Sequence, residues 1–86
     1  MTRLWPEGQP IQVWCGGDGA PHRFTWHGYH YHILAIQQQW QVDTDWWESS
    51  GRVWRAYLAV ATREGLFCVI YQDLLDDMWY LSKAYD

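Results

Sequence analysis

The chain has 86 residues, which predicts one small domain, and 19% of them are aromatic, including eight tryptophans. A chain of this length buries only about 60–65% of the surface that its unfolded form exposes, so its core is marginal. Each aromatic side chain can bury roughly 150–250 Å², and we therefore expect most of the rings to lie in the core. The formal net charge of −4 disfavours nucleic-acid binding, because counterion release requires clustered cations.

No apolar run approaches the roughly 20 residues that span a bilayer, and the N-terminal sequence MTRLWPEGQP lacks the apolar segment of a secretory signal. We therefore expect a cytoplasmic protein. Cys15 and Cys68 lie far apart in the sequence and match neither a disulfide framework nor a metal motif. In a reducing compartment both are expected to be buried thiols that pack as small hydrophobic side chains.

Short β segments separated by turn residues follow one another along the chain, as in a small barrel or sandwich. Residues 1–21 contain all three prolines and several glycines, so we expect a loosely ordered segment with one strand, Ile11–Cys15. The GGDG sequence at 16–19 predicts a turn. A second strand is expected at Arg23–Trp26, followed by a tight turn at His27 and Gly28.

The segment Tyr29–Val42 is ambiguous, because its apolar residues fit both strand alternation and helical spacing. We favour a strand that bends or bulges near Gln37–Gln39. The next segment predicts a clearer strand, and Gly65 marks a hairpin turn that requires a left-handed backbone. The strands expected in this half of the chain are Val53–Thr62, Leu66–Asp73 and Met78–Tyr85.

The predicted fold is therefore all-β, with five or six short antiparallel strands in a small, partly open barrel or SH3-like roll. Residues 22–86 form a tryptophan-rich β domain. Residues 1–21 add an N-terminal strand and a Gly/Pro-rich segment to the same single domain.

From His22 to Asp86 the order of short motifs resembles a known family. The motifs are Trp40-x-Val42-Asp43, Trp46-Trp47-Glu48, Arg55-x-Tyr57, Gly65, Tyr71-x-Asp73 and Trp79-Tyr80-Leu81-x-Lys83-x-Tyr85-Asp86. They are similar to those of a small tryptophan-rich bacterial domain of unknown function. That domain is found alone and at the C-terminus of actinobacterial ImuB proteins, which are inactive relatives of Y-family DNA polymerases.

The resemblance implies a non-enzymatic adaptor module with no catalytic residues and no cofactor. It implies a protein partner, such as a polymerase or another replication or repair component, and a link to DNA damage tolerance. Leu74 and Leu75 depart from the family pattern, which has polar turn residues after Tyr-x-Asp.

The two leucines are followed by Asp76 and Asp77, and an apolar tip with an acidic rim is typical of a surface that binds a basic protein partner. Burial of one leucine in the core is the alternative. Adjacent tryptophans on a strand face opposite ways, so one of Trp46 and Trp47 is expected to be exposed. The predicted partner-binding residues are Leu74, Leu75, Asp76, Asp77, Trp46 and Trp47.

Two clusters suggest metal sites. Asp43 and Asp45 form the Asp-x-Asp pattern of a Mg²⁺–nucleotide site, but no phosphate-binding loop accompanies it, so hydrogen bonding at a turn is the favoured interpretation. His30 and His32 share a strand face and with His27 suggest a zinc site, although the spacing matches no closed zinc motif. We expect these histidines to cover a half-exposed sheet edge and to bind no metal.

The alternative function is binding of single-stranded nucleic acid, in which bases stack on exposed aromatic side chains of a small β-barrel. The residues for this function are Arg23, Arg52, Arg55 and Trp47. The chain has few cations and an acidic net charge, so protein docking is the preferred interpretation.

Overall fold

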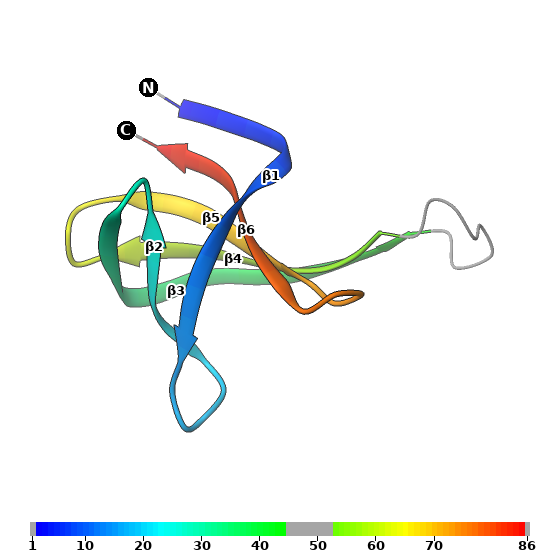
Figure 1. Cartoon of the computed structure of the whole chain (residues 1–86), viewed down its shortest axis with the longest axis horizontal. Coiled ribbons are helices and arrows are strands. Elements are labelled where there is room, and N and C mark those ends of the chain that lie inside the picture. The colour runs from blue at the N-terminus through cyan, green and yellow to red at the C-terminus, as the bar shows by residue number, and fades with distance from the viewer. Residues whose placement is uncertain (1, 45–52, 86) are drawn as a thin grey trace.

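The computed structural model describes residues 2–44 and 53–85, and in it six antiparallel strands form a closed barrel (Figure 1). Each strand pairs with the next along the chain, and the last strand closes onto the first. The all-β prediction is confirmed, and the ring is closed rather than partly open. The described residues include no helix long and apolar enough to cross a membrane. The strands are β1 (Thr2–Cys15), β2 (Pro21–Trp26), β3 (Tyr29–Thr44), β4 (Val53–Thr62), β5 (Phe67–Asp73) and β6 (Met78–Tyr85).

Residues with positive φ form the predicted turns. His27 (φ 52°) and Gly28 (φ 79°) connect the paired residues Trp26 and Tyr29, and two successive positive values are typical of a type I′ hairpin turn. Gly65 has φ 93° in the turn between β4 and β5, as expected.

The interior of the barrel is mostly aliphatic. Along β4 the side chains alternate, so that Leu58 and Val60 point into the barrel and are buried. The core cluster consists of Ile11, Phe24, Trp26, Leu58, Val60, Cys68, Ile70, Leu81 and Ala84.

The expectation that most rings are core residues is wrong for the described part of the chain. Only three of the described rings are buried, and they belong to Phe24, Trp26 and Tyr71. A barrel of only six strands encloses little volume, so aliphatic side chains fill most of it and many rings lie on its outer surface. The exposed rings are those of Trp14, Tyr29, Trp40, Phe67 and Tyr85.

The N-terminal strand is longer than predicted, because β1 begins at Thr2 instead of Ile11. It pairs with β6 on both sides of a register break between Leu4 and Gln9, and the chain bends there at Gly8 (φ 76°). The expected loose order is therefore wrong for residues 2–15. Pairing with a distant strand holds this segment, and neither its prolines nor its glycines predict that partner.

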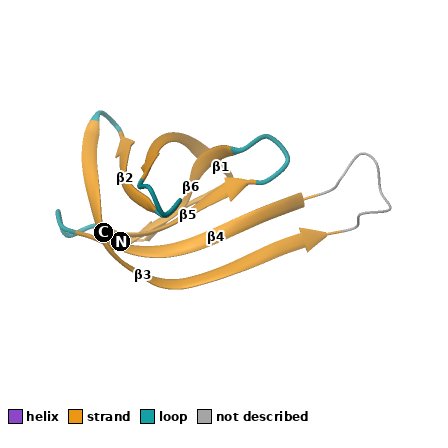
Figure 2. Cartoon of the chain, turned by 90° about the horizontal axis from the view of Figure 1, so that it is seen from below, coloured by secondary structure: helices purple, strands orange, loops and turns teal. Residues whose placement is uncertain are grey.

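β3 is a strand along its whole length, with register breaks at Ile33/Ala35 and Ile36/Gln38. The second break lies where the bend was predicted. β3 and β4 run side by side past the rest of the barrel as a two-stranded ribbon (Figures 1 and 2). β2 pairs with β3 only as far as His32.

Candidate binding groove on the outer sheet face

A row of four rings crosses the outer face of β3, β4, β5 and β6. Its members occupy facing positions on neighbouring strands. The ring centroids of Trp40 and Tyr57 are 5.4 Å apart, and the successive distances to Tyr71 and Tyr80 are 5.0 and 5.2 Å. Centroid distances of this size are typical of favourable aromatic pairs. We call these four residues the tyrosine row.

Two further rows run parallel to the tyrosine row. The next row has small side chains at its centre and consists of Gln38, Ala59, Val69 and Lys83. The third row is again aromatic and consists of Ala61, Phe67 and Tyr85. Residues on one face of a strand repeat every two positions, so the two aromatic rows stand about 13 Å apart with low side chains between them.

These rows enclose an open groove of about 800 Å³. Its walls are the exposed rings of Trp40 on one side and of Phe67 and Tyr85 on the other, which are 40%, 42% and 41% exposed. Ala59 and Val69 form its floor. The groove therefore offers aromatic surface on two sides of a shallow apolar floor.

Polar groups lie at the two ends of the groove. The side chains of Gln37 and Gln38 belong to β3 at one end, and Lys83 belongs to β6 at the other. The Lys83 ammonium lies 4.9 Å from the centroid of the Tyr85 ring, which is within cation–π distance. The groove thus has amide donors and acceptors at one end and a positive charge at the other.

Arg55 and β1 contact the tyrosine row and hold it in place. The Arg55 guanidinium carbon lies 4.5 Å from the centroid of the Tyr71 ring, and its Nη1 donates a hydrogen bond of 3.2 Å to the Tyr57 hydroxyl. The Tyr71 hydroxyl donates to the Glu7 carbonyl at 3.1 Å. Burial raises the pKa of Tyr71 and so favours the neutral, donating form of this hydroxyl. The groove wall is therefore anchored to the barrel.

The predicted leucine tip lies in the turn between β5 and β6. Leu75 is 53% exposed, and Asp76 and Asp77 are exposed beside it. Leu74 is half-buried, and its N–H donates to the Trp54 carbonyl at 2.8 Å. Leu75 thus presents most of the apolar surface of this tip.

Two aspartate side chains make the hydrogen bonds that stabilise this turn. The Asp73 carboxylate accepts a hydrogen bond of 2.9 Å from the Leu75 N–H, and the Asp76 carboxylate accepts one of 2.8 Å from the Met78 N–H. The tyrosine row separates this tip from the groove along β5 and β6.

Other predicted site residues fall outside the described part of the chain or in different places. Asp45, Trp46, Trp47 and Arg52 lie outside the described residues. Arg23 on β2 stacks on Trp14 at 4.3 Å, whereas Arg55 on β4 stacks on Tyr71, and β2 and β4 are not neighbours in the barrel. The structure does not bring these two arginines together.

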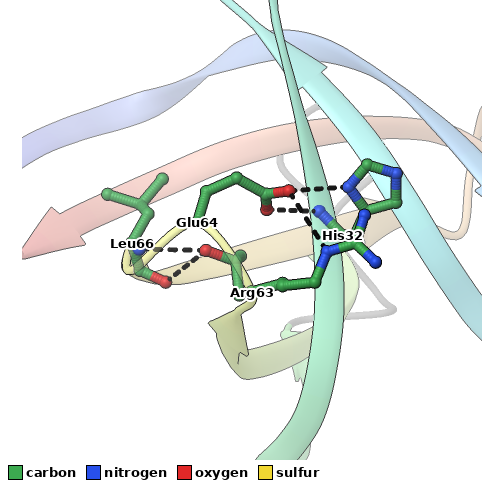
Figure 3. Close-up of polar contacts among 5 residues, drawn as sticks. His32, Arg63, Glu64 and Leu66 are labelled. Atoms are coloured by element: carbon green, nitrogen blue, oxygen red, sulfur yellow. Dashed lines mark hydrogen bonds and ion pairs between the residues drawn. The ribbon is translucent and has the colours of Figure 1, made fainter.

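The described histidines have separate partners. His32 binds Glu64 twice, through its backbone N–H at 2.7 Å and through Nδ1 at 2.7 Å (Figure 3). These bonds to His32 lower the pKa of Glu64. His27 lies 3.4 Å from the Gln9 amide, and the His30 ring lies beside Trp14. Over residues 2–44 and 53–85 no three His, Cys, Asp or Glu side chains are placed to hold a metal ion.

The two cysteines differ in exposure. Cys68 is buried as expected, and burial raises its thiol pKa to about 12. The prediction is wrong for Cys15, which is exposed at the end of β1. Strand alternation does not protect Cys15, because β1 leaves the barrel there and enters the turn to β2.

The sequence prediction missed most of the groove. Strand alternation in the sequence does place Tyr57, Ala59 and Ala61 on one face of one strand. What it lacked was the register that sets Phe67 and Tyr85 beside them. The pattern that indicates the groove is a row of small residues between two aromatic rows. This pattern can be recognised only once the register between the four neighbouring strands is known.

Comparison with protein families identifies a domain of unknown function, DUF6504, over residues 6–86. Comparisons with curated proteins and with solved structures found no match. The matched range runs from within β1 to the end of the chain and so contains every residue of the groove.

Proposed function

The chain belongs to the DUF6504 family of domains of unknown function, and we propose that it is a non-enzymatic interaction module that docks an extended segment of a partner protein. The observation that carries this proposal is the groove, in which the exposed rings of Trp40, Phe67 and Tyr85 flank a floor of small side chains. Exposed aromatic surface of this kind is enriched at protein interfaces, where rings supply contact area at low entropic cost.

The groove indicates the chemistry of the docked segment. An apolar or prolyl side chain fits between the two aromatic rows, over Ala59 and Val69. The amides of Gln37 and Gln38 can bond to the backbone of the segment at one end. Lys83 at the other end favours an acidic residue at that end of the segment. We therefore infer an extended peptide with an apolar residue near its centre and an acidic residue at one end.

The leucine tip is a second contact region in this proposal. Leu75 is exposed between acidic side chains, so a basic residue of the same partner is favoured there. A catalytic role is less well supported, because in the described part of the chain Ser82 lines the groove without a hydrogen-bonded base.

Selection of peptides from a random library on the immobilised domain tests the proposal. Selected peptides are expected to bind wild type and to lose at least about tenfold in affinity to Phe67→Ser, which removes one groove wall. Leu34→Ser is the matched control, because Leu34 is 67% exposed and lies outside the groove. Failure to select any peptide, or equal binding by wild type and Phe67→Ser, would contradict the proposal that the groove binds a peptide.

The biological setting of this proposal rests on the family resemblance. We propose that the domain works as an adaptor within a larger complex, with a link to DNA damage tolerance. The matching experiment is purification of the protein from its own cells. A polymerase or repair protein recovered with wild type but not with Phe67→Ser is the expected result.

Single-stranded nucleic acid is the second candidate ligand, and one observation favours it. Trp14 is exposed and carries the Arg23 guanidinium on its face, which is a small stacking platform with a cation. If this function is correct, fluorescent oligonucleotides bind at low salt, and binding falls steeply as salt rises. Absence of binding at low salt excludes it.

A further inference from the structure

β3 has an open edge over more than half of its length. β2 pairs with β3 only at Tyr29–His32, whereas β4 follows β3 as far as Thr44. In the part of the chain that the structure describes, no other strand pairs with residues 33–44 (Figure 2). Proteins usually protect such an edge with lysines, prolines or bulges. Here the bulges end at Gln38, and residues 38–44 contain neither lysine nor proline and have a single charged side chain, that of Asp43.

The direction of the peptide groups follows from one hydrogen bond. The Trp54 carbonyl accepts from the Leu74 N–H, on the side of β4 that faces β5. The N–H and C=O of one residue in an antiparallel strand point to the same side, so Trp54 and its β3 partner form a non-hydrogen-bonded pair. Such pairs recur at every second position, and the next two are Gln41 with Ala56 and Gln39 with Leu58. The peptide groups of Gln39 and Gln41 therefore point away from β4, toward the open edge.

We propose that two copies of this chain pair antiparallel through this edge of β3, with a two-fold axis beside Gln41. In this register Gln41 exchanges both peptide hydrogen bonds with Gln41 of the second copy. Trp40 then lies opposite Val42 of the second copy. Trp40 and Val42 share the outer face, so an aromatic residue meets a β-branched residue on both sides of the axis.

The other symmetric registers with a hydrogen-bonded pair on the axis fit less well. An axis beside Asp43 places two carboxylates directly opposite each other, which is destabilising. An axis beside Gln39 places Trp40 opposite Gln38 and brings the bulge into the pairing. The register centred on Gln41 sets apolar against apolar side chains, and Asp43 faces Gln39. No like charges meet.

The paired segment is short, so the dimer is expected to be reversible and concentration-dependent. Stable interfaces usually bury about 800 Å² per partner, and a seven-residue strand pair is expected to bury less than this. Edge pairing continues the sheet, and a two-fold axis perpendicular to it leaves both grooves on one face. The dimer then presents two docking grooves to a partner with two binding segments, which raises the effective affinity. Self-association itself does not depend on what the groove binds.

Sedimentation equilibrium of the full chain from about 5 to 500 µM tests the proposal, and wild type is expected to pass from monomer to dimer. Gln41 is exposed, so Gln41→Glu and Gln41→Lys are expected to fold. Each variant weakens the dimer by at least about tenfold, because like charges meet on the axis. Gln12→Glu, at another exposed glutamine, on β1, is the matched control and leaves the dimer unchanged.

An equimolar mixture of the Gln41→Glu and Gln41→Lys proteins is the decisive sample. With one variant labelled with ¹⁵N, native mass spectrometry is expected to show a heterodimer, since opposite charges then meet on the axis. Hydrogen exchange of wild type gives an independent measurement, in which the Gln41 amide is protected only at high concentration.

Three results would overturn the proposal. The first is a wild type that stays monomeric at every concentration. The second is a dimer that neither Gln41 variant weakens. The third is a mixture of the two variants that forms no heterodimer although wild type dimerises. This result would show that the two-fold axis does not lie beside Gln41.

Discussion

Replacement of Tyr71 measures how strongly the tyrosine row stabilises the domain. Tyr71 is only 1% exposed, although it lies on the outer face of the sheet, because β1 covers it. Its ring contacts Tyr57 and Tyr80, the Arg55 guanidinium lies over it, and its hydroxyl donates to the Glu7 carbonyl. Two substitutions separate the ring from the hydroxyl.

Tyr71→Phe removes only the hydroxyl and is expected to cost about 0.5–1.5 kcal/mol of unfolding free energy, the net value of a neutral hydrogen bond. Tyr71→Leu also removes two aromatic pairs, each worth about 0.5–1.5 kcal/mol, and a cation–π contact of about 0.5–1 kcal/mol. Its expected total cost is about 2–5 kcal/mol. A domain of this size has a stability of roughly 4–13 kcal/mol, so the Leu variant is expected to lose a large part of it.

Urea unfolding followed by tryptophan fluorescence measures both values. Tyr29→Phe is the control, because Tyr29 is 69% exposed and its variant is expected to change stability by less than about 0.5 kcal/mol. A loss below about 1 kcal/mol in Tyr71→Leu would refute the stabilising role of the row. Equal losses in the Phe and Leu variants would assign the effect to the hydroxyl alone.

Three further predictions concern other parts of the domain. Gly8→Ala is expected to destabilise the fold by about 2–4 kcal/mol in urea unfolding, because φ is positive and a Cβ would collide with the tyrosine row. The bonds to His32 lower the pKa of Glu64 in the folded protein. They therefore stabilise the fold fully above the unfolded-state pKa of about 4.3, and this stabilisation is lost as the pH falls through the lower folded-state pKa. Glu64→Gln should therefore weaken the acid dependence of the melting temperature. An aromatic disulfide reagent is expected to modify exposed Cys15 rapidly and buried Cys68 only after unfolding.

Each of these predictions has a control and a contradicting result. Gly17→Ala is the control for Gly8, because nothing lies within 4 Å of the added Cβ, and equal costs at the two glycines would remove the steric argument. The same acid dependence in wild type and Glu64→Gln would show that the bonds to His32 do not contribute. Rapid reaction of two thiols in the folded protein would contradict the burial of Cys68.

Part of this protein follows from its sequence alone. Period-two alternation in Val53–Thr62 correctly sorts the side chains onto two faces, because successive residues of any strand point to opposite faces, and the structure shows that the face with Leu58 and Val60 is the buried one. Turn chemistry at His27, Gly28 and Gly65 is equally local, since positive φ is accessible to few residue types. Strand composition and turns were therefore sufficient for the all-β fold and for all six strands, although β1 was predicted to begin at Ile11 and begins at Thr2.

The tertiary structure alone decided where the rings lie and what holds the N-terminal strand. Whether Tyr71 is core or surface depends on β1, whose Glu7 and Gly8 cross it from far away in the sequence. The groove exists because Phe67 and Tyr85 stand in register with each other across β5 and β6. A sequence pattern gives the face of each strand but not the register between strands, which is set by packing among residues that are distant in the chain.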